Sequence, residues 1–208
     1  MAKQYGFYFD ANRCIQCRTC EVACKSMRNV GPGMKWRRVI DIWDGTYPNV
    51  TRAFFSLACM HCGKPACIEA CATGAIRKRV EDGIVVVDRD KCNGCRDCFS
   101  ACPYGVPQFD DKGIMQMCDF CTGVNVEPVC AVFCPTEALN FGTLDELLQM
   151  AKGKAAKRME GATEPSNIIV GVLRGLPASC TQTASDQANF TSISHSEPLH
   201  FDSGGDRV

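Results

Sequence analysis

The chain has 208 residues, which is enough for one large domain or two small ones. Its charges balance, with 23 Lys and Arg against 23 Asp and Glu, and no basic stretch indicates nucleic-acid binding. The longest strongly apolar run, at residues 168–173, is too short to span a bilayer. The unusual feature is the 17 cysteines; if most of them bind metal, the apolar core is thin and stability depends on the metal.

The N-terminal part contains the first of four cysteine groups. Residues 5–10 predict a short strand that leads into Cys14, Cys17, Cys20 and Cys24. Residues 35–44 and 51–58 each have a strand pattern, and the polar turn residues between them predict a β-hairpin. The basic residues of this hairpin either dock a partner or form a solvated face, and both interpretations stay open for Lys35, Arg37 and Arg38.

The middle of the chain contains the second and third groups. The second is Cys59, Cys62, Cys67 and Cys71, and we expect His61 within it to pack or hydrogen-bond rather than bind metal. Residues 77–88 predict a hairpin with an Asp-Gly turn. It leads into a C-x2-C-x2-C-x3-C-P run, the spacing of bacterial iron–sulfur ferredoxins, formed by Cys92, Cys95, Cys98, Cys102 and Pro103.

The C-terminal part holds the last group. Residues 106–117 predict a hairpin that enters Cys118, Cys121, Cys130 and Cys134. Residues 143–146 have the form of a capping box, which predicts a helix from there to about Arg158. The chain then looks extended, and residues 179–208 have a composition typical of disorder. Cys180, in that tail, is expected to be a free thiol without a role.

The spacing of the sixteen grouped cysteines favours iron–sulfur chemistry. Each iron of a [4Fe-4S] cluster takes one thiolate, so four groups can hold four clusters. Zinc ribbons also use paired C-x2-C units, but they do not need the closely spaced third and fourth cysteines. Disulfides are typical of secreted scaffolds, and no signal peptide is recognisable at the start. A structural zinc protein is the alternative of a different class.

In two-cluster ferredoxins, the fourth cysteine of each group reaches the other cluster. The same rule predicts four ligand sets here, which we number 1 to 4. Set 1 is Cys14, Cys17, Cys20 and Cys134; set 2 is Cys118, Cys121, Cys130 and Cys24; set 3 is Cys59, Cys62, Cys67 and Cys102; set 4 is Cys92, Cys95, Cys98 and Cys71.

The expected fold class is α+β, with two interleaved ferredoxin-like modules of short hairpins and helices. The pairing of the groups inserts one module into the other. The predicted parts are residues 4–34 and 115–142 for the first module, 35–58 for an inserted hairpin, 59–114 for the second module, 143–178 for a helix and an extended partner-binding segment, and 179–208 for the tail.

Several stretches resemble the iron–sulfur subunits of membrane-linked molybdopterin oxidoreductases, above all the B subunit of anaerobic dimethyl sulfoxide reductase. The resemblance covers residues 4 to about 175 and is carried by residues 4–7, 14–25, 81–88, 102–109 and 145–147. Two departures are visible. Ala72 follows Cys71 where the family commonly has Pro, and the tail after Ala178 has no recognisable counterpart.

This resemblance implies a non-catalytic subunit with four [4Fe-4S] clusters. Its implied partners are a large molybdenum- or tungsten-pterin catalytic subunit, near set 1, and a quinol-oxidising membrane subunit, near set 4. Nitrate-reductase relatives carry Trp and a three-iron cluster at the position of Cys95, so the cysteine here implies a fourth cubane. Residues 165–170 are similar to a segment that lies against a partner.

We expect no catalytic site, because the three histidines are scattered along the chain: His61, His195 and His200. The resemblance implies a peripheral location on the cytoplasmic membrane through partners, on the outer face by co-export with the catalytic subunit, or else on the cytoplasmic face. The rival interpretation within the same chemistry is a soluble polyferredoxin that serves a hydrogenase or a formate dehydrogenase.

Overall fold

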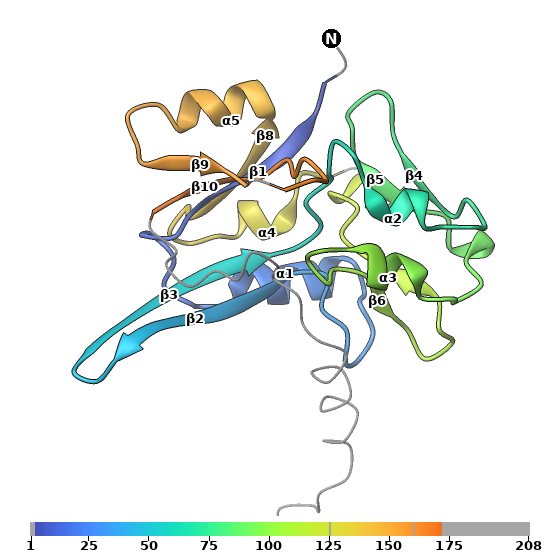
Figure 1. Ribbon diagram of the computed structural model, residues 1–208, viewed down its shortest axis with the longest axis horizontal. Helices are drawn as coiled ribbons and strands as arrows, with labels where there is room; N and C mark the ends of the chain where they lie inside the picture. The colour runs from blue at the N-terminus through green and yellow to red at the C-terminus, as the bar shows by residue number, and fades with distance from the viewer. Residues whose placement is uncertain (1–2, 125, 160, 172–208) are drawn as a thin grey trace, which may run out of the picture.

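The computed structural model describes residues 3–124, 126–159 and 161–171, and it is organised around a four-stranded sheet of order β8-β1-β10-β9 (Figure 1). Strand β1 (Tyr5–Asp10), which the sequence predicts correctly, lies inside this sheet. It pairs antiparallel with β8 (Leu139–Thr143) and parallel with β10 (Ile168–Val170). The sheet therefore joins the start of the chain to segments that follow the last cysteine group.

Three two-stranded hairpins carry the chain between the cysteine groups, as predicted. The longest is β2 (Arg38–Thr46) with β3 (Asn49–Leu57), which projects from the rest of the molecule at the lower left of Figure 1. The other two are short: β4 (Ile76–Lys78) with β5 (Val85–Val87), and β6 (Gln108–Phe109) with β7 (Met115–Gln116).

Short helices stand within or directly after the cysteine groups. They are α1 (Thr19–Met27), α2 (Ala66–Glu69), α3 (Asp97–Ala101) and α4 (Val129–Val132), with two 3-10 turns at Arg89–Lys91 and Thr122–Val124. Helix α1 packs against α4, and α2 packs against α3. The first group thus lies beside the fourth, and the second beside the third, in a mixed α/β fold.

The helix predicted from the capping box begins where expected but ends much earlier. Thr143 Oγ1 accepts a hydrogen bond from Glu146 N at 3.4 Å, and Glu146 Oε2 accepts one from Thr143 N at 2.8 Å. Helix α5 runs only over Leu144–Met150, so its predicted end near Arg158 is wrong. Gly153 turns the chain at φ 75°, and residues Ala156–Arg158 form β9 instead, where β10 supplies backbone partners.

The segment that the resemblance places against a partner is part of the chain's own sheet. Ile168, Ile169 and Val170 are buried in β10. Just before them, Ser166 Oγ donates to His61 O at 3.0 Å, and Asn167 Oδ1 accepts from Phe7 N at 3.4 Å. The predictions for the tail, Cys180 among them, lie outside the described residues. Within the described ranges, no helix is long and apolar enough to cross a membrane.

Candidate metal centres

The backbone has the same unusual conformation in all four cysteine loops. The residue before the second cysteine has a positive φ each time: 60° at Gln16, 43° at His61, 75° at Gly94 and 60° at Phe120. Three of these are not glycine, and such residues cost about 1–3 kcal/mol in strained backbone conformations. Left-handed turns of this kind orient successive N–H groups toward one side, which creates a concavity suited to an anion. The loops are therefore shaped for negatively charged groups.

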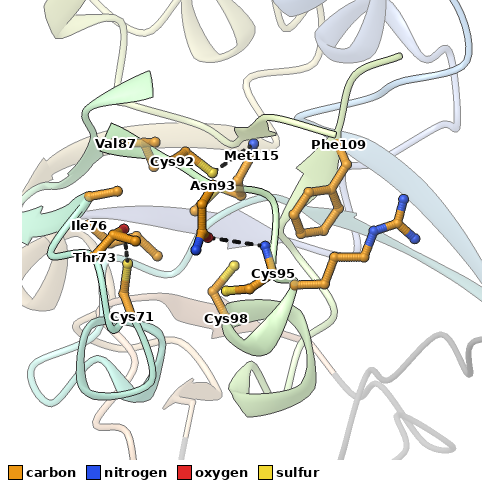
Figure 2. A pocket seen from close by; sticks show the side chains of 12 residues that line it. Cys71, Thr73, Ile76, Val87, Cys92, Asn93, Cys95, Cys98, Phe109 and Met115 are labelled. Carbon is orange, nitrogen blue, oxygen red and sulfur yellow. Dashed lines mark hydrogen bonds between the residues drawn. The ribbon is translucent and has the colours of Figure 1, made fainter. Parts of the chain in front are cut away.

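Set 4 lines one cavity, which Figure 2 shows from close by. Cys71 enters it from the second group, and Cys92, Cys95 and Cys98 enter it from the third. Phe109 and Met115 form part of the wall, and Met115 N donates to Cys92 Sγ at 3.4 Å. The structure thus brings together four cysteines that the cross-ligation rule had grouped.

Hydrogen bonds favour the ionised form of the Cys71 thiol in this cavity and lower its pKa. Burial raises its pKa, but hydrogen bonds from the Thr73 side chain and from the backbone N–H groups of Ile76 and Ala75 together lower it by more, so the net pKa lies below the ordinary thiol value. The Thr73 hydroxyl lies 3.5 Å from Cys71 Sγ. A thiolate is the form that binds iron, so these donors favour metal binding.

Set 3 is more deeply buried. Burial raises the pKa of Cys67 to about 12, with the neighbouring Cys102 and Cys62 acting in the same direction. Burial raises the pKa of Cys59 well above the ordinary value, with Cys67 the next cause. These thiols are neighbours that resist ionisation on their own, so a cation must supply the energy to deprotonate them.

In sets 1 and 2, too, burial and neighbouring cysteines of the same set raise the pKa of the thiols. Burial raises the pKa of Cys14, and the charges of Cys20, Cys134 and Cys17 act in the same direction. Burial also raises the pKa of Cys24 to about 12; Cys130 and Cys121 raise it too, while Arg37 lowers it. All sixteen grouped cysteines are free thiols in the structure, which contradicts a disulfide scaffold. Within the described residues, no three or more His, Cys, Asp or Glu side chains converge closely enough to hold a single metal ion.

The charge around sets 1 and 2 fits iron–sulfur clusters. Arg37 is 1% exposed, and its Nε and Nη2 have no hydrogen-bond partner among the described residues. A buried cation without a counter-ion is strongly unfavourable. A cluster with its four thiolates carries net negative charge, so it would supply the missing counter-charge. The donor set and the buried cation therefore both fit the predicted cofactor.

This position of Arg37 contradicts both interpretations for that residue; Lys35 and Arg38 are half-buried, and both interpretations stay open for them. Arg37 is neither solvated nor available to a partner, and the other two contact the chain itself: Lys35 Nζ lies 2.9 Å from Glu21 Oε2, and Arg38 Nη2 donates to Gly105 O at 2.9 Å. Sequence reasoning missed Arg37 as part of a site. The available signal was its place two residues before Val39, which is buried on the same side of the strand.

His61 packs and hydrogen-bonds, as expected. It is fully buried, and its Nδ1 accepts a hydrogen bond from Val85 N at 3.1 Å. Burial, then the charges of Arg37 and Lys78, lower its pKa to about 3, so the ring is neutral at physiological pH. His195, His200 and Cys180 lie outside the described residues.

Cysteine loops, short helices and hairpins of this kind define the class of ferredoxin-type proteins that carry [4Fe-4S] clusters. Residues 50–144 match the family described as 4Fe-4S dicluster domain, which argues against a structural zinc protein. The chain belongs to the family of the iron–sulfur (B) subunits of anaerobic dimethyl sulfoxide reductase.

Three relatives show the extent of this similarity. A probable anaerobic dimethyl sulfoxide reductase chain of Escherichia coli K12, YnfG, is 44% identical over 161 residues, which cover 72% of this chain and 78% of the relative. The B subunit of anaerobic dimethyl sulfoxide reductase from the same organism is 44% identical over 159 residues (71% and 77%). The formate dehydrogenase iron–sulfur subunit of Wolinella succinogenes is 35% identical over 181 residues (74% and 89%).

Family membership decides the general role of the chain. It is an iron–sulfur electron-transfer subunit of an oxidoreductase complex, and it is not the catalytic subunit.

Proposed function

We propose that the chain holds four [4Fe-4S] clusters in sets 1 to 4 and relays electrons between a quinol-linked membrane subunit and a large molybdopterin catalytic subunit. The observation that carries this proposal is the cavity of Figure 2, where one cysteine of the second group joins three of the third. When bound, the clusters would take up and release electrons one at a time. The protein's part is to hold them, exclude water and place N–H and O–H donors on the ligand sulfurs.

We also propose the interleaved arrangement of two modules, residues 4–34 with 115–142 around residues 59–114. Two helix contacts support it: α1 packs against α4, and α2 against α3. Strand pairing supports it as well, because β1 and β8 bring the sequences before the first group and after the fourth group together.

The two ends of the proposed relay are sets 1 and 4. Of the sixteen grouped cysteines, Cys17 of set 1 and Cys95 of set 4 are the exposed ones. Ile15 and Phe133, beside set 1, have 63% and 58% of their surface exposed. Exposed apolar side chains next to an accessible ligand support contact with another subunit at this place. We assign set 1 to the side of the catalytic subunit and set 4 to the side of the membrane subunit.

The proposed location is the cytoplasmic membrane, reached through the partners, on its outer face by co-export with the catalytic subunit. Protease treatment of intact spheroplasts tests it. Digestion of the chain without lysis is the expected result, and protection until lysis would place the protein on the cytoplasmic face.

Similarity to a formate dehydrogenase iron–sulfur subunit favours a second candidate, in which the same relay serves a formate-oxidising enzyme. Affinity purification under anaerobic conditions, with identification of the co-purifying subunits, separates the candidates. A molybdopterin subunit active on a sulfoxide or a related acceptor supports the first, and one active on formate supports the second. A free small brown protein would contradict both and indicate a soluble polyferredoxin. Substantially fewer than about 16 irons per chain would contradict the four clusters.

A further inference from the structure

Arg37 is fixed in the interior by contacts from two strands. It directly precedes β2, and its Nη1 donates to Ser56 O at 3.3 Å and to Ser56 Oγ at 3.1 Å in the facing strand β3. The guanidinium carbon lies 4.2 Å from the centre of the Phe7 ring in β1. Among the residues that the structure describes, no carboxylate forms an ion pair with it. The side chain is therefore held in one place without a carboxylate counter-ion.

Its electrostatic neighbours are ligands of two different sets. Burial lowers the pKa of Arg37, but the charges of thiolates of both sets together raise it by more, so the pKa lies above its ordinary value; these thiolates belong to Cys130, Cys118, Cys20 and Cys24. Cys20 is in set 1, and the other three are in set 2.

Contacts on two sides place Arg37 next to both sets. Ser56 Oγ, which accepts from Arg37, also lies 3.5 Å from Cys20 Sγ. On the other side, the Phe7 ring that Arg37 covers lies 4.5 Å, centre to centre, from the ring of Phe120, which stands between Cys118 and Cys121 of set 2 in the chain. Burial raises the pKa of Cys130, another ligand of set 2, and the charge of Arg37 lowers it. One guanidinium thus lies between the ligands of set 1 and those of set 2.

We infer that Arg37 is a positioning residue that sets the reduction potentials of the two clusters in sets 1 and 2, raising both by its permanent positive charge. This inference rests on the proposed occupation of those sets. One-electron reduction adds a negative charge and forms no bond, and a nearby cation stabilises the added charge. Arginine does not lose its proton in proteins, and at 1% exposure salt screens its charge only weakly. The effect is therefore independent of pH and weakly dependent on ionic strength.

The test is a potentiometric titration, followed by EPR, of the complete subunit complex carrying Arg37→Met. This change removes the charge and puts a long, unbranched apolar side chain in the place of the arginine. We expect two of the four reduction steps to become less favourable by about tenfold or more, where each tenfold corresponds to about 59 mV for one electron. The other two steps are expected to stay within about threefold of wild type.

Two further variants separate charge from packing. Arg158→Met removes the same charge from an exposed position on β9 and is expected to leave all four potentials unchanged. Arg37→Lys keeps the charge and is expected to restore both shifted potentials to within about threefold of wild type. Unchanged potentials in Arg37→Met, or equal shifts in Arg37→Met and Arg37→Lys, would overturn the inference.

Loss of clusters in Arg37→Met is also informative. If Arg37→Lys then keeps all its iron, the charge is what the two sets require, and the inference stands. If both variants lose the same iron, the role of Arg37 is packing, and the inference fails. Wild-type iron far below about 16 per chain would instead contradict the four-cluster proposal itself.

Discussion

Cys71 and Cys98 line the same cavity, although one closes the second cysteine group and the other belongs to the third. The hairpin of β4 and β5 lies between them in the sequence and returns the chain to the cavity. Burial raises the pKa of Cys98 to about 12, with the charges of Cys95, Cys71 and Cys92 acting in the same direction, as close neighbours do. The meeting of these cysteines in one cavity is thus a local consequence of how one hairpin closes.

Replacement of Cys71 by Ser tests this set. A hydroxyl is a poorer iron ligand than a thiolate, so we expect the variant to lose between about one and four of about 16 irons and to show one altered reduction step. Iron and acid-labile sulfide analysis with EPR measures both. Cys180→Ser is the matched control and should keep all its iron. Wild-type iron and spectra in Cys71→Ser would remove Cys71 from the ligand set.

Iron removal is expected to unfold most of the chain. The main core cluster contains Cys20, Cys59 and Cys118 together with apolar residues such as Phe7 and Phe55, so metal binding and core formation are coupled. The test is to chelate the iron under denaturing conditions and then refold the chain without metal. On heating, the far-UV circular dichroism of this apoprotein should show no cooperative transition. An apoprotein that melts cooperatively would show that the core forms without clusters.

Asp110 predicts a pH effect on the β6–β7 hairpin. Its carboxylate accepts hydrogen bonds from Ile114 N at 2.8 Å, Lys112 N at 3.0 Å and Gln116 Nε2 at 3.0 Å. Burial raises its pKa, and these bonds together lower it by more, to below the ordinary 3.8. Because the folded pKa is depressed, the ionised group stabilises the protein above pH 3.8, and this contribution is lost as the pH falls through the lower folded value.

Asp110→Asn keeps an acceptor oxygen and removes the charge. We expect the variant to lose its clusters at lower guanidinium concentration than wild type, and by the same margin from about pH 8 down to about pH 5, because the wild-type carboxylate stays ionised throughout this range. Absorbance of the clusters follows the effect at pH values where acid does not itself release the labile sulfide, and the exposed Asp111→Asn is the control. Equal guanidinium midpoints for Asp110→Asn and wild type would mean that the charge of Asp110 contributes nothing.

Thr143→Ala should loosen the first turn of α5. The substitution removes the side-chain acceptor for Glu146 N, and loss of an N-cap of this kind costs about 1 kcal/mol. Amide hydrogen exchange in residues 144–150 should become severalfold faster, while exchange in β2 and β3 stays unchanged. Leu148→Ala, at a side chain with 51% of its surface exposed, should have a smaller effect.

The parts of the fold that follow from neighbouring residues were predicted well. Strand β1, the three hairpins and the capping box at Thr143 all lie where the sequence places them. Turn residues and alternation act over a few positions, so the sequence contains the whole cause. The predicted end of α5 was wrong because residues Ala156–Arg158 pair with β10 as strand β9. Strand β10 lies further along the chain, so this pairing could not be recognised from Ala156–Arg158 alone.

The sequence by itself determined the class of cofactor, because four cysteine groups that begin with C-x2-C, two of them with the full C-x2-C-x2-C-x3-C spacing of ferredoxins, are typical of iron–sulfur proteins. Only the tertiary structure decided what surrounds them. Residues 168–170 form a strand of the chain's own sheet, and Arg37 is buried near thiols of two sets. Both results depend on strand pairing and burial, which bring together residues that are far apart in the chain. Local spacing specifies ligands, whereas the charge that acts on them depends on the packed interior.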